Sequence, residues 1–332
     1  MEVKLAEQTF KSEVGSCPEG MIPILRNQRP NSRTRGDIRQ GIDSSHGHFQ
    51  HKLTVNASEA DPANLHDATV AHEYAKYQFS SGSALYRGAK GYFNVWKPSV
   101  EASYEFSLTQ LRLAAGSSVQ KDLNTIDVGW RVYNSTYYDA LPHLFISWTT
   151  INGESEGCYD LQCPGFVQIS SKVVVGGSLS ASLSQTNGPQ YEMQVIVFWD
   201  RGTDAWWLHV NGEYVGYWPN SLFTSLKAGA NSVEWGGEIL NGGNGSTHTK
   251  TDMGSGEFAQ LGWQRAAFIR SLMTVTSTPQ QVFVDAPLVP SKVITTKANC
   301  YSEQIFHDSS SPGDWRTWMY YGGPGLTYDC PT

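Results

Sequence analysis

The sequence predicts an all-β protein, an antiparallel β-sandwich of two sheets preceded by a largely irregular N-terminal segment. Its 332 residues include 11 Trp, 16 Tyr and 32 Gly, a composition that favours strands joined by tight turns. From about Ala71 onwards, short runs of alternating apolar and polar residues follow one another, separated by Gly, Asn and Ser. About 250 residues of short strands spaced by turns are typical of a sandwich or barrel.

The first 70 residues differ from the rest in composition and hydrophobic pattern, so we expect a separate segment at 1–70 and a β-sandwich domain at 71–332. Residues 18–70 are rich in Arg, His, Asn and Ser and show almost no apolar periodicity, as expected of a flexible segment or linker. The opening decapeptide MEVKLAEQTF lacks the basic start and apolar stretch of a signal peptide. Either the chain is not secreted, or its true N-terminus is missing from this sequence.

The charge balance argues against a nucleic-acid partner. The chain carries 31 acidic and 24 basic side chains, a net charge of −7, and its basic residues do not form a stripe that could follow phosphates. The longest apolar run, VIVFW at 195–199, is far shorter than the roughly 20 residues that span a bilayer. The sequence therefore predicts a soluble protein with neither nucleic acid nor membrane as a partner.

The five cysteines divide into two pairs and one remainder. Cys158 and Cys163 lie five positions apart in GCYDLQCPG, and Cys300 and Cys330 bracket a C-terminal segment rich in Ser, Pro and Gly. Two local disulfides are the simplest interpretation, and Cys17 is then left over. A zinc site is the alternative, but the CxxxxC spacing stands without a second close Cys or His pair. We expect no bound metal and no cofactor.

Three Asn-X-Ser/Thr triplets begin at Asn56, Asn134 and Asn244. Such triplets are acceptors for N-glycosylation in secreted proteins, although they also arise by chance. Together with the expected disulfides they favour an extracellular chain, in which Cys17 would pair with a cysteine of the missing N-terminal part.

Two expected strands carry an acid beside a glycine on the face opposite their apolar residues. In VEWGGEIL (233–240) Glu238 shares its face with Gly236, and in IDVGWRV (126–132) Asp127 shares its face with Gly129 and Arg131. If the apolar faces form the core, both acids project from the outer surface of one sheet. The glycines would then clear a groove in which a peptide backbone could approach closely.

Several strings of the chain together resemble the neprosin family of plant secreted prolyl endopeptidases of the glutamic peptidase type. They are unusual in their Trp and Gly content, occur in one order and cover essentially the whole chain. The strings are SCPEGMIPILR (16–26), EFSLTQL (105–111), LNTIDVGWRVY (123–133), GCYDLQCPGFVQ (157–168), WWLHVNGEYVGYWPNSLF (206–223), VEWGGEI (233–239), HTKTDMGSGEF (248–258), NCY and YYGGPG.

The resemblance implies a propeptide, here residues 1–70, that is removed from a catalytic β-sandwich with two disulfides, here residues 71–332. It also implies secretion, peptide substrates cut after proline, and two catalytic glutamates, one in IEAGW and one in WGGE. The second falls on Glu238. The first falls on Asp127, because this sequence reads IDVGW, so a shorter side chain replaces the first catalytic glutamate of the family.

Two close carboxylates can hydrolyse a peptide without a metal, because one stays protonated while the other acts as base on a water. Asp in place of Glu withdraws the carboxylate by about 1.5 Å, and a misplacement of that order can cost around 100-fold in rate. A donor must also meet the tetrahedral oxyanion. The candidates are Gln110, Gln168 and Tyr217.

The remaining candidates are aromatic or imidazole side chains. His248 in STHTKT could shape the site, although a histidine in a Gly-rich loop is more often merely exposed. An aromatic slot for a proline ring could form from Trp206, Trp207, Tyr217 and Trp218, with about half of them filling the core instead. The alternative function is a catalytically impaired β-sandwich that binds proline-rich or carbohydrate ligands on such aromatic residues.

Overall fold

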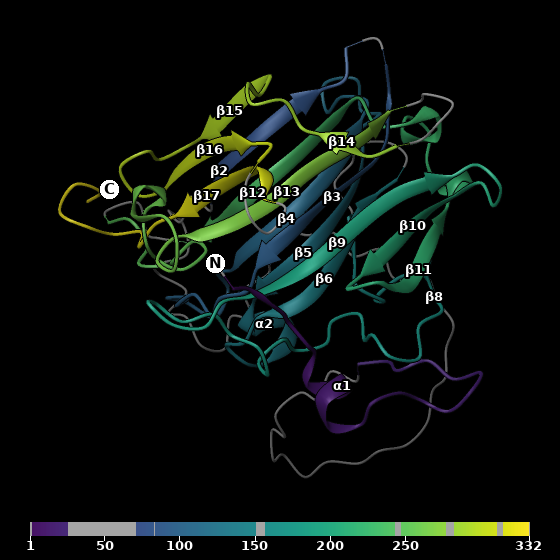
Figure 1. Cartoon of the computed structure of the whole chain (residues 1–332), viewed down its shortest axis with the longest axis horizontal. Coiled ribbons are helices and arrows are strands. Elements are labelled where there is room, and N and C mark those ends of the chain that lie inside the picture. The colour runs from purple at the N-terminus through teal and green to yellow at the C-terminus, as the bar shows by residue number, and fades with distance from the viewer. Residues whose placement is uncertain are drawn as a thin grey trace, which may run out of the picture.

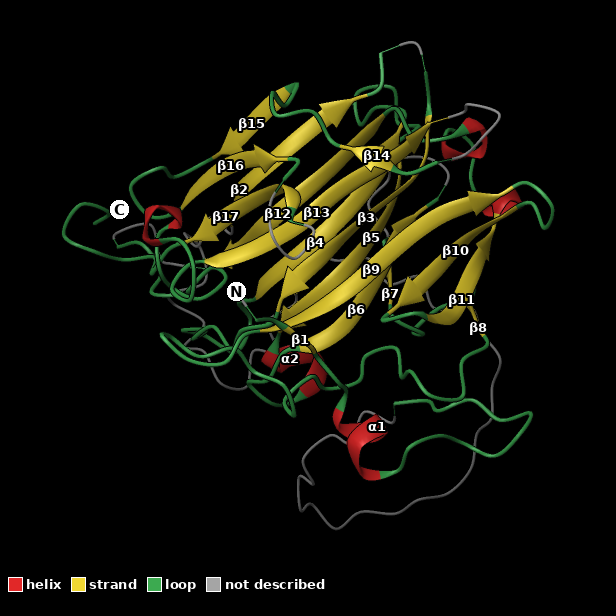
Figure 2. Ribbon diagram, viewed as in Figure 1, coloured by secondary structure: helices red, strands yellow, loops and turns green. Residues whose placement is uncertain are grey.

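The protein is an antiparallel β-sandwich of two sheets, as predicted (Figures 1 and 2). The computed structural model describes residues 2–25, 71–82, 84–150, 157–242, 247–276, 282–310 and 315–331. One sheet has seven strands in the order β15 (Lys292–Thr295), β2 (Ala71–Ser80), β12 (Ser232–Asn241), β4 (Ser107–Ala115), β5 (Asn124–Val132), β6 (His143–Thr149) and β7 (Cys158–Tyr159).

The second sheet has ten strands and forms the other layer. Its main order is β16 (Ser302–Asp308), β17 (Arg316–Gly322), β13 (Ala267–Thr276), β3 (Tyr86–Asn94), β9 (Tyr191–Asp200), β10 (Ala205–Val210), β11 (Glu213–Pro219) and β8 (Val167–Gln168). Two short strands join it at the side, β1 (Lys4–Leu5) on β9 and β14 (Val284–Asp285) on β13.

Helices are short and lie at the periphery of the two sheets (Figure 2). They are α1 (Thr9–Glu13), α2 (Asn134–Tyr137) and the 3-10 turns η2 (Asn220–Leu222), η3 (Leu226–Ala228) and η4 (Ala259–Leu261). No helix in the part of the chain that the structure describes is long and apolar enough to cross a membrane.

The core lies between the sheets and follows the alternation expected from the sequence. On β4, β5 and β12 every second residue points inward, because successive side chains of a strand point to opposite faces. The inward residues are fully buried; they include Leu111, Ile126, Val128, Trp130, Val233 and Trp235. The other face of these strands is therefore the outer face of the seven-stranded sheet, and it carries Asp127 and Glu238.

The two glycines beside these acids serve strand packing rather than a groove. A Cβ on Gly129 would lie 1.7 Å from the carbonyl oxygen of Thr109. Gly236 has a φ of +151°, and its Cβ would lie 2.3 Å from the carbonyl oxygen of Ala75 and 2.4 Å from the Cβ of Lys76. Neighbouring strands fill the space beside both residues, so glycine is required by close backbone approach. The predicted glycine-lined groove is absent at these two positions.

Residues 2–25 dock on the sandwich although they contain little regular structure. Strand β1 pairs in parallel with β9, and Ala6, 1% exposed, joins the hydrophobic core. The Gln8 side chain donates to the carbonyl oxygen of Val174 (2.7 Å) and accepts from its amide (2.8 Å). Strand β2 begins at Ala71, and residues 26–70 lie outside the described residues, so the division into a segment at 1–70 and a domain at 71–332 stays a prediction.

The predicted disulfides are confirmed. Cys158 is bonded to Cys163 and Cys300 to Cys330, and Cys17 is free. Of the three glycosylation candidates, Asn134 is exposed in α2; Asn56 and Asn244 lie outside the described residues, and modification of all three stays a prediction.

Candidate active site

A cavity of about 180 Å³ opens on the outer face of the seven-stranded sheet. Side chains of β2, β4, β5, β6, β7 and β12 line it, together with Phe106 just before β4. Glu238 is one of these lining residues, and Asp127 is not. The cavity combines charged groups with apolar walls, which is the usual character of a small-molecule or peptide site.

Glu238 is a buried carboxylate whose two oxygens are both engaged. His72 on β2 donates from Nδ1 to Oε1 (2.6 Å), and Gln110 on β4 donates from Nε2 to Oε2 (2.9 Å). Burial by itself would raise the pKa of Glu238. The hydrogen bond from His72 and the positive charges of Arg112, His72 and Lys76 outweigh burial and lower that pKa below the ordinary value of 4.5. Glu238 is therefore ionised in mildly acidic solution.

Asp127 lies on the same face but in a different contact network. Its Oδ1 accepts from Nε of Arg112, and its Oδ2 accepts from the hydroxyls of Thr125 and Ser147, both at 3.1 Å. Asp127 is 3% exposed. The carboxylate is thus held by a permanent cation and two hydroxyls, and the contacts of Glu238 do not include it.

The strand register explains why the two acids have different partners. Strand β4 lies between β12 and β5, and Asp127 is level with Arg112 and Glu234. Glu238 is level with Leu108 and Arg131, four residues further along the strands. At about 3.3 Å per residue, this offset is roughly 13 Å along the strand direction. Gln110, in the row between, is the side chain that reaches Glu238.

Arg112 couples the two acids electrostatically. It lines the cavity, contacts Asp127 and lies in the field of Glu238. Burial would lower the pKa of Arg112, but the charges of Asp127 and Glu238 raise it above its ordinary value, so the guanidinium stays charged. Arg131, which shares a face with Asp127 on β5, donates to Tyr137 (3.3 Å). Arg112, rather than Arg131, pairs with Asp127 because Arg112 on β4 lies directly opposite Asp127 in the neighbouring strand.

Of the secondary site candidates, only Gln110 is brought to Glu238. Gln168 lies on β8 in the other sheet, where its amide donates to the carbonyl oxygens of Pro23 (2.9 Å) and Val173 (3.1 Å). Tyr217 and Trp218 lie on β11 of that same sheet. The alternation that assigns faces along one strand does not tell which of two sheets the strand joins.

The four residues of the expected aromatic slot point in two directions. Trp206 and Trp218 are fully buried in the core, while Trp207 and Tyr217 pack against each other on the opposite face, with ring centroids 4.9 Å apart. Half of the set therefore fills the core, as expected. The remaining half lies on the outer face of the ten-stranded sheet, across the sandwich from the cavity, and forms no slot beside Glu238.

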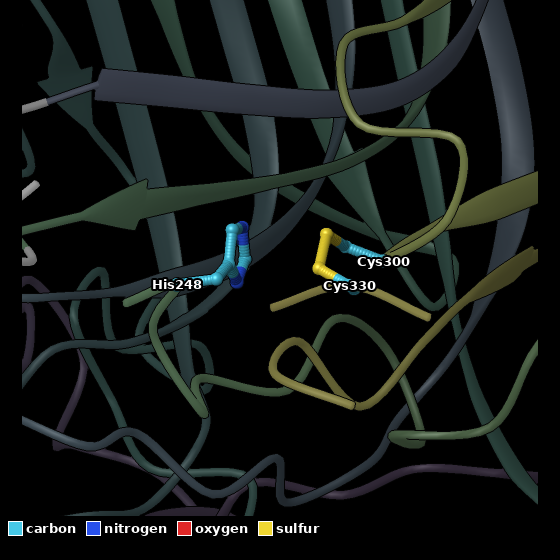
Figure 3. Close-up of side chains that lie close together, drawn as sticks. All are labelled: His248, Cys300 and Cys330. Atoms are coloured by element: carbon cyan, nitrogen blue, oxygen red, sulfur yellow. A yellow bond between two sulfur atoms is a disulfide. The ribbon is translucent and has the colours of Figure 1, made fainter. Parts of the chain in front are cut away.

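His248 lies at a second, fully enclosed location. Its Nε2 bonds to Oε2 of Glu73 (2.8 Å) and its Nδ1 donates to the carbonyl oxygen of Thr249 (2.8 Å). It stands beside the Cys300–Cys330 disulfide (Figure 3), within 4.8 Å between potential ligand atoms. The two sulfurs are bonded to each other, so they offer no thiolate to a metal. Among the described residues, His248 has no contact with the cavity.

The sequence analysis did not single out several of the cavity-lining residues, among them His72, Tyr74 and Arg112. The signal was present in AHEYAKYQF (71–79) and LTQLRLA (108–114), where polar residues alternate with inward apolar ones. Arg112 is two positions from Gln110, and His72 and Tyr74 are two positions apart, so each pair shares a face. These pairs lie on β2 and β4, which flank β12 in the sheet. The local pattern does not reveal that strand order, so it could not place the pairs beside Glu238.

The fold and the site together define an antiparallel β-sandwich with a buried, ionised glutamate at an open cavity on the outer face of one sheet. The sequence model of the Neprosin family matches residues 103–324, and the chain belongs to this family. Membership supports a peptidase-like function, a hydrolase acting on peptide substrates.

The chain is also similar to solved structures at low sequence identity. The chain is similar to scytalido-glutamic peptidase bound to a transition-state analogue inhibitor, with 11% identity, a TM-score of 0.38, and coverage of 77% of this chain and 100% of that one. It is also similar to CG-16, a homodimeric agglutinin from chicken liver, with 7% identity, a TM-score of 0.26, and coverage of 49% and 93%.

Proposed function

We propose that the protein is a secreted endopeptidase of the glutamic type that cleaves peptides after proline at acid pH. The observation that carries this proposal is Glu238, a carboxylate with a lowered pKa that lines an open cavity and accepts hydrogen bonds from His72 and Gln110. Membership of the neprosin family supplies the peptide substrate class. The disulfides support secretion, because such bonds persist in oxidising compartments.

In the proposed reaction, Glu238 acts first as base and then as acid. Each carboxylate oxygen offers more than one acceptor site, so a water can bind Glu238 beside His72 or Gln110. Glu238 takes a proton from this water while the hydroxyl oxygen bonds to the peptide carbonyl carbon. The protonated Glu238 then gives the proton to the leaving nitrogen as the C–N bond breaks and the carbonyl re-forms.

Gln110 supplies a hydrogen-bond donor to the site, and Arg112 supplies a positive charge. Gln110 uses one amide N–H on Glu238, and its second N–H is a donor for the tetrahedral oxyanion. Arg112 adds a permanent charge beside both acids. Asp127 acts in this proposal by holding Arg112 in place. A proton shared between Asp127 and Glu238 requires the Asp127 carboxylate to leave its contact with Arg112.

The experiment is a cleavage assay from pH 2 to 7 with a fluorogenic peptide that contains one proline and a matched peptide with alanine in its place. The full chain and a chain trimmed at Ala71 are compared, each as wild type and as Glu238→Gln. We expect the wild type to cut after proline, most rapidly below neutrality. Glu238→Gln keeps the shape of the side chain but cannot exchange the proton, so we expect at least a 100-fold loss of rate.

Glu213→Gln is the matched control, because Glu213 pairs with Lys172 (2.8 Å) on the surface of the ten-stranded sheet. It should cleave like the wild type. Equal rates for Glu238→Gln and Glu213→Gln, or a folded and trimmed wild type that cuts neither peptide, would refute the proposal.

A binding module is the second candidate, and one observation favours it. On the outer face of the ten-stranded sheet, Trp207 packs against Tyr214 (5.5 Å between ring centroids) and Tyr217 (4.9 Å), and Tyr214 is 51% exposed. Aromatic faces of this kind stack on sugar or proline rings. Binding of an oligosaccharide or a proline-rich peptide that is lost in Trp207→Ala, without cleavage by the wild type, would establish this function instead.

A further inference from the structure

Arg131 is another charged residue that lines the cavity containing Glu238. It lies on β5 in the same cross-strand row as Glu238, with Leu108 of β4 between them. Both side chains line the cavity, and Arg131 is only 4% exposed. Their backbones are two strand spacings apart, about 10 Å. An extended peptide held at Glu238 covers this distance with about three residues.

The charge of Arg131 is poorly compensated. Its Nη2 donates to Tyr137 at 3.3 Å and stands 4.0 Å from Oδ2 of Asp160, at the outer limit of an ion pair. Its Nε has no hydrogen-bond partner among the described residues. Removing a guanidinium from water is costly unless it is paired and hydrogen-bonded.

Asp160 is engaged elsewhere. Its Oδ2 accepts from the Tyr137 hydroxyl (2.8 Å) and its Oδ1 from the amide of Ile146 (3.1 Å). Burial raises the pKa of Asp160 above its ordinary value, although the charge of Arg131 partly opposes this. As the pH falls, Asp160 is therefore neutralised earlier than an ordinary aspartate, and the charge on Arg131 is left still less balanced.

Two other cations at this face, Arg112 and Lys76, have direct acidic partners. Arg112 contacts Asp127, and Lys76 lies 2.7 Å from Glu234. Arg131 instead faces the rings of Tyr133, Tyr137, Phe145 and Tyr159, at 5.1 to 5.4 Å. Aromatic faces stabilise a cation only partly. They leave the bidentate edge of a guanidinium available to a planar anion.

The apolar part of the cavity suits the short aliphatic portion of a ligand that ends in a carboxylate. Its lining includes Leu108, Phe106 and Phe145, and its volume of about 180 Å³ is several times the roughly 30 Å³ that one water occupies in the liquid. A small side chain or the last residue of a peptide fits this space, with its polar end at Arg131 and its stem on the apolar wall.

We propose that Arg131 forms a carboxylate-binding subsite beside Glu238, so that the enzyme prefers peptides with a carboxylate within about three residues of the cleaved bond. This inference rests on the proposed function and names its substrate class. The carboxylate comes either from an Asp or Glu side chain or from the C-terminus of the peptide. In both cases Arg131 replaces its weak contact with Asp160 by direct hydrogen bonds to the ligand.

Three peptides of equal length with one proline test the subsite. The first has Glu after the proline and an amidated C-terminus, the second has Gln there and a free C-terminal carboxylate close to the proline, and the third has Gln and an amidated C-terminus. Dissociation constants are measured by calorimetry on the full chain and kcat/KM by cleavage. We expect the first or the second peptide to exceed the third by about 10- to 100-fold, as for hydrogen bonds to a charged group. Which of the two does so identifies the source of the carboxylate.

Arg131→Gln should remove this preference, so that its constants for the three peptides agree within about threefold, and Arg131→Lys should retain part of it because the charge stays. The comparison of peptides on the wild type needs no variant, so a folding defect of Arg131→Gln does not obscure the result. Equal constants for all three peptides, or no binding of any, overturn the subsite. Preferential binding without cleavage supports the subsite and counts against the proposed function, so the two failures are distinguishable.

Discussion

Two histidine–glutamate pairs begin at adjacent positions of β2, and their surroundings differ. On the outer face His72 bonds to Glu238 (2.6 Å), and the His72 side chain is 50% exposed. On the inner face Glu73 bonds to His248 (2.8 Å), and these side chains are 4% and 0% exposed. Alternation along a strand sends neighbouring residues to opposite faces. The same two chemical groups thus form a candidate catalytic pair on the outer face, where solvent and substrate have access. On the inner face, where they do not, the groups form a structural contact.

The inner pair connects parts of the chain that are distant in sequence. Glu73 also accepts from Asn241 at the end of β12 (3.0 Å), and the amide of His248 donates to the carbonyl oxygen of Pro331 (3.2 Å). The pair therefore joins β2 and β12 to the C-terminal segment that the Cys300–Cys330 disulfide closes. Glu238, in contrast, has its partners within one face of one sheet.

The largest difference between the pairs should appear in stability. His248→Ala leaves the Glu73 carboxylate buried without its partner, and we expect the free energy of unfolding to fall by about 3–5 kcal/mol. His72→Ala removes a half-exposed partner, and we expect a loss of about 1 kcal/mol or less. Urea unfolding of both variants and the wild type measures the two losses. Equal losses would show that the inner pair is not the structural one.

A second contrast should appear in the pH profile of cleavage. Because the His72 hydrogen bond lowers the pKa of Glu238, the base should stay active to below pH 4.5, its ordinary pKa, and lose activity as the pH falls through the lowered value. His72→Gln should shift this acidic limb to higher pH. In His248→Gln the limb should stay in place, since His248 does not contact the cavity. Profiles of kcat/KM from pH 2 to 7 decide the matter; a limb that moves equally in both variants would contradict the assignment.

The smallest expected effect is the pH dependence of the inner pair. Burial would lower the pKa of His248, but the hydrogen bonds to Glu73 and Thr249 and the charge of Glu73 raise it above 6.5. A raised histidine pKa stabilises the fold fully below the unfolded value, and this contribution is lost as the pH rises through the folded value. The difference in unfolding midpoint between wild type and His248→Gln should therefore shrink above pH 6.5. A difference that is constant from pH 5 to 9 would argue against a protonated His248.

Local patterns in the sequence predicted much of the fold. The alternation of apolar residues identified the inward faces of the strands that carry Asp127 and Glu238. The disulfides followed because Cys158 and Cys163 are close in sequence and because Cys300 and Cys330 enclose one turn-rich segment. These features depend on residues near each other in the chain or on a single strand, and a strand has a fixed period of two.

The partners of each acid could not be predicted in the same way. The motif resemblance suggested that Asp127 is the partner of Glu238, whereas the structure places Gln110 and His72 on Glu238 and Arg112 on Asp127. The strand that carries Gln110 and Arg112 lies between those of the two acids, and the register of this strand decides which side chains are level. Residues far apart in sequence set that register.

The sequence by itself determined the class of fold, the face on which each acid lies, the two disulfides and the family. Only the tertiary structure decided which strands are neighbours, that Gln168, Tyr217 and Trp218 belong to the other sheet, and that Glu238 opens to a cavity while His248 does not. The physical reason is that side-chain direction along a strand is a local property of the backbone. Strand order and register, in contrast, minimise the exposed apolar area and the unpaired backbone groups of the whole chain at once.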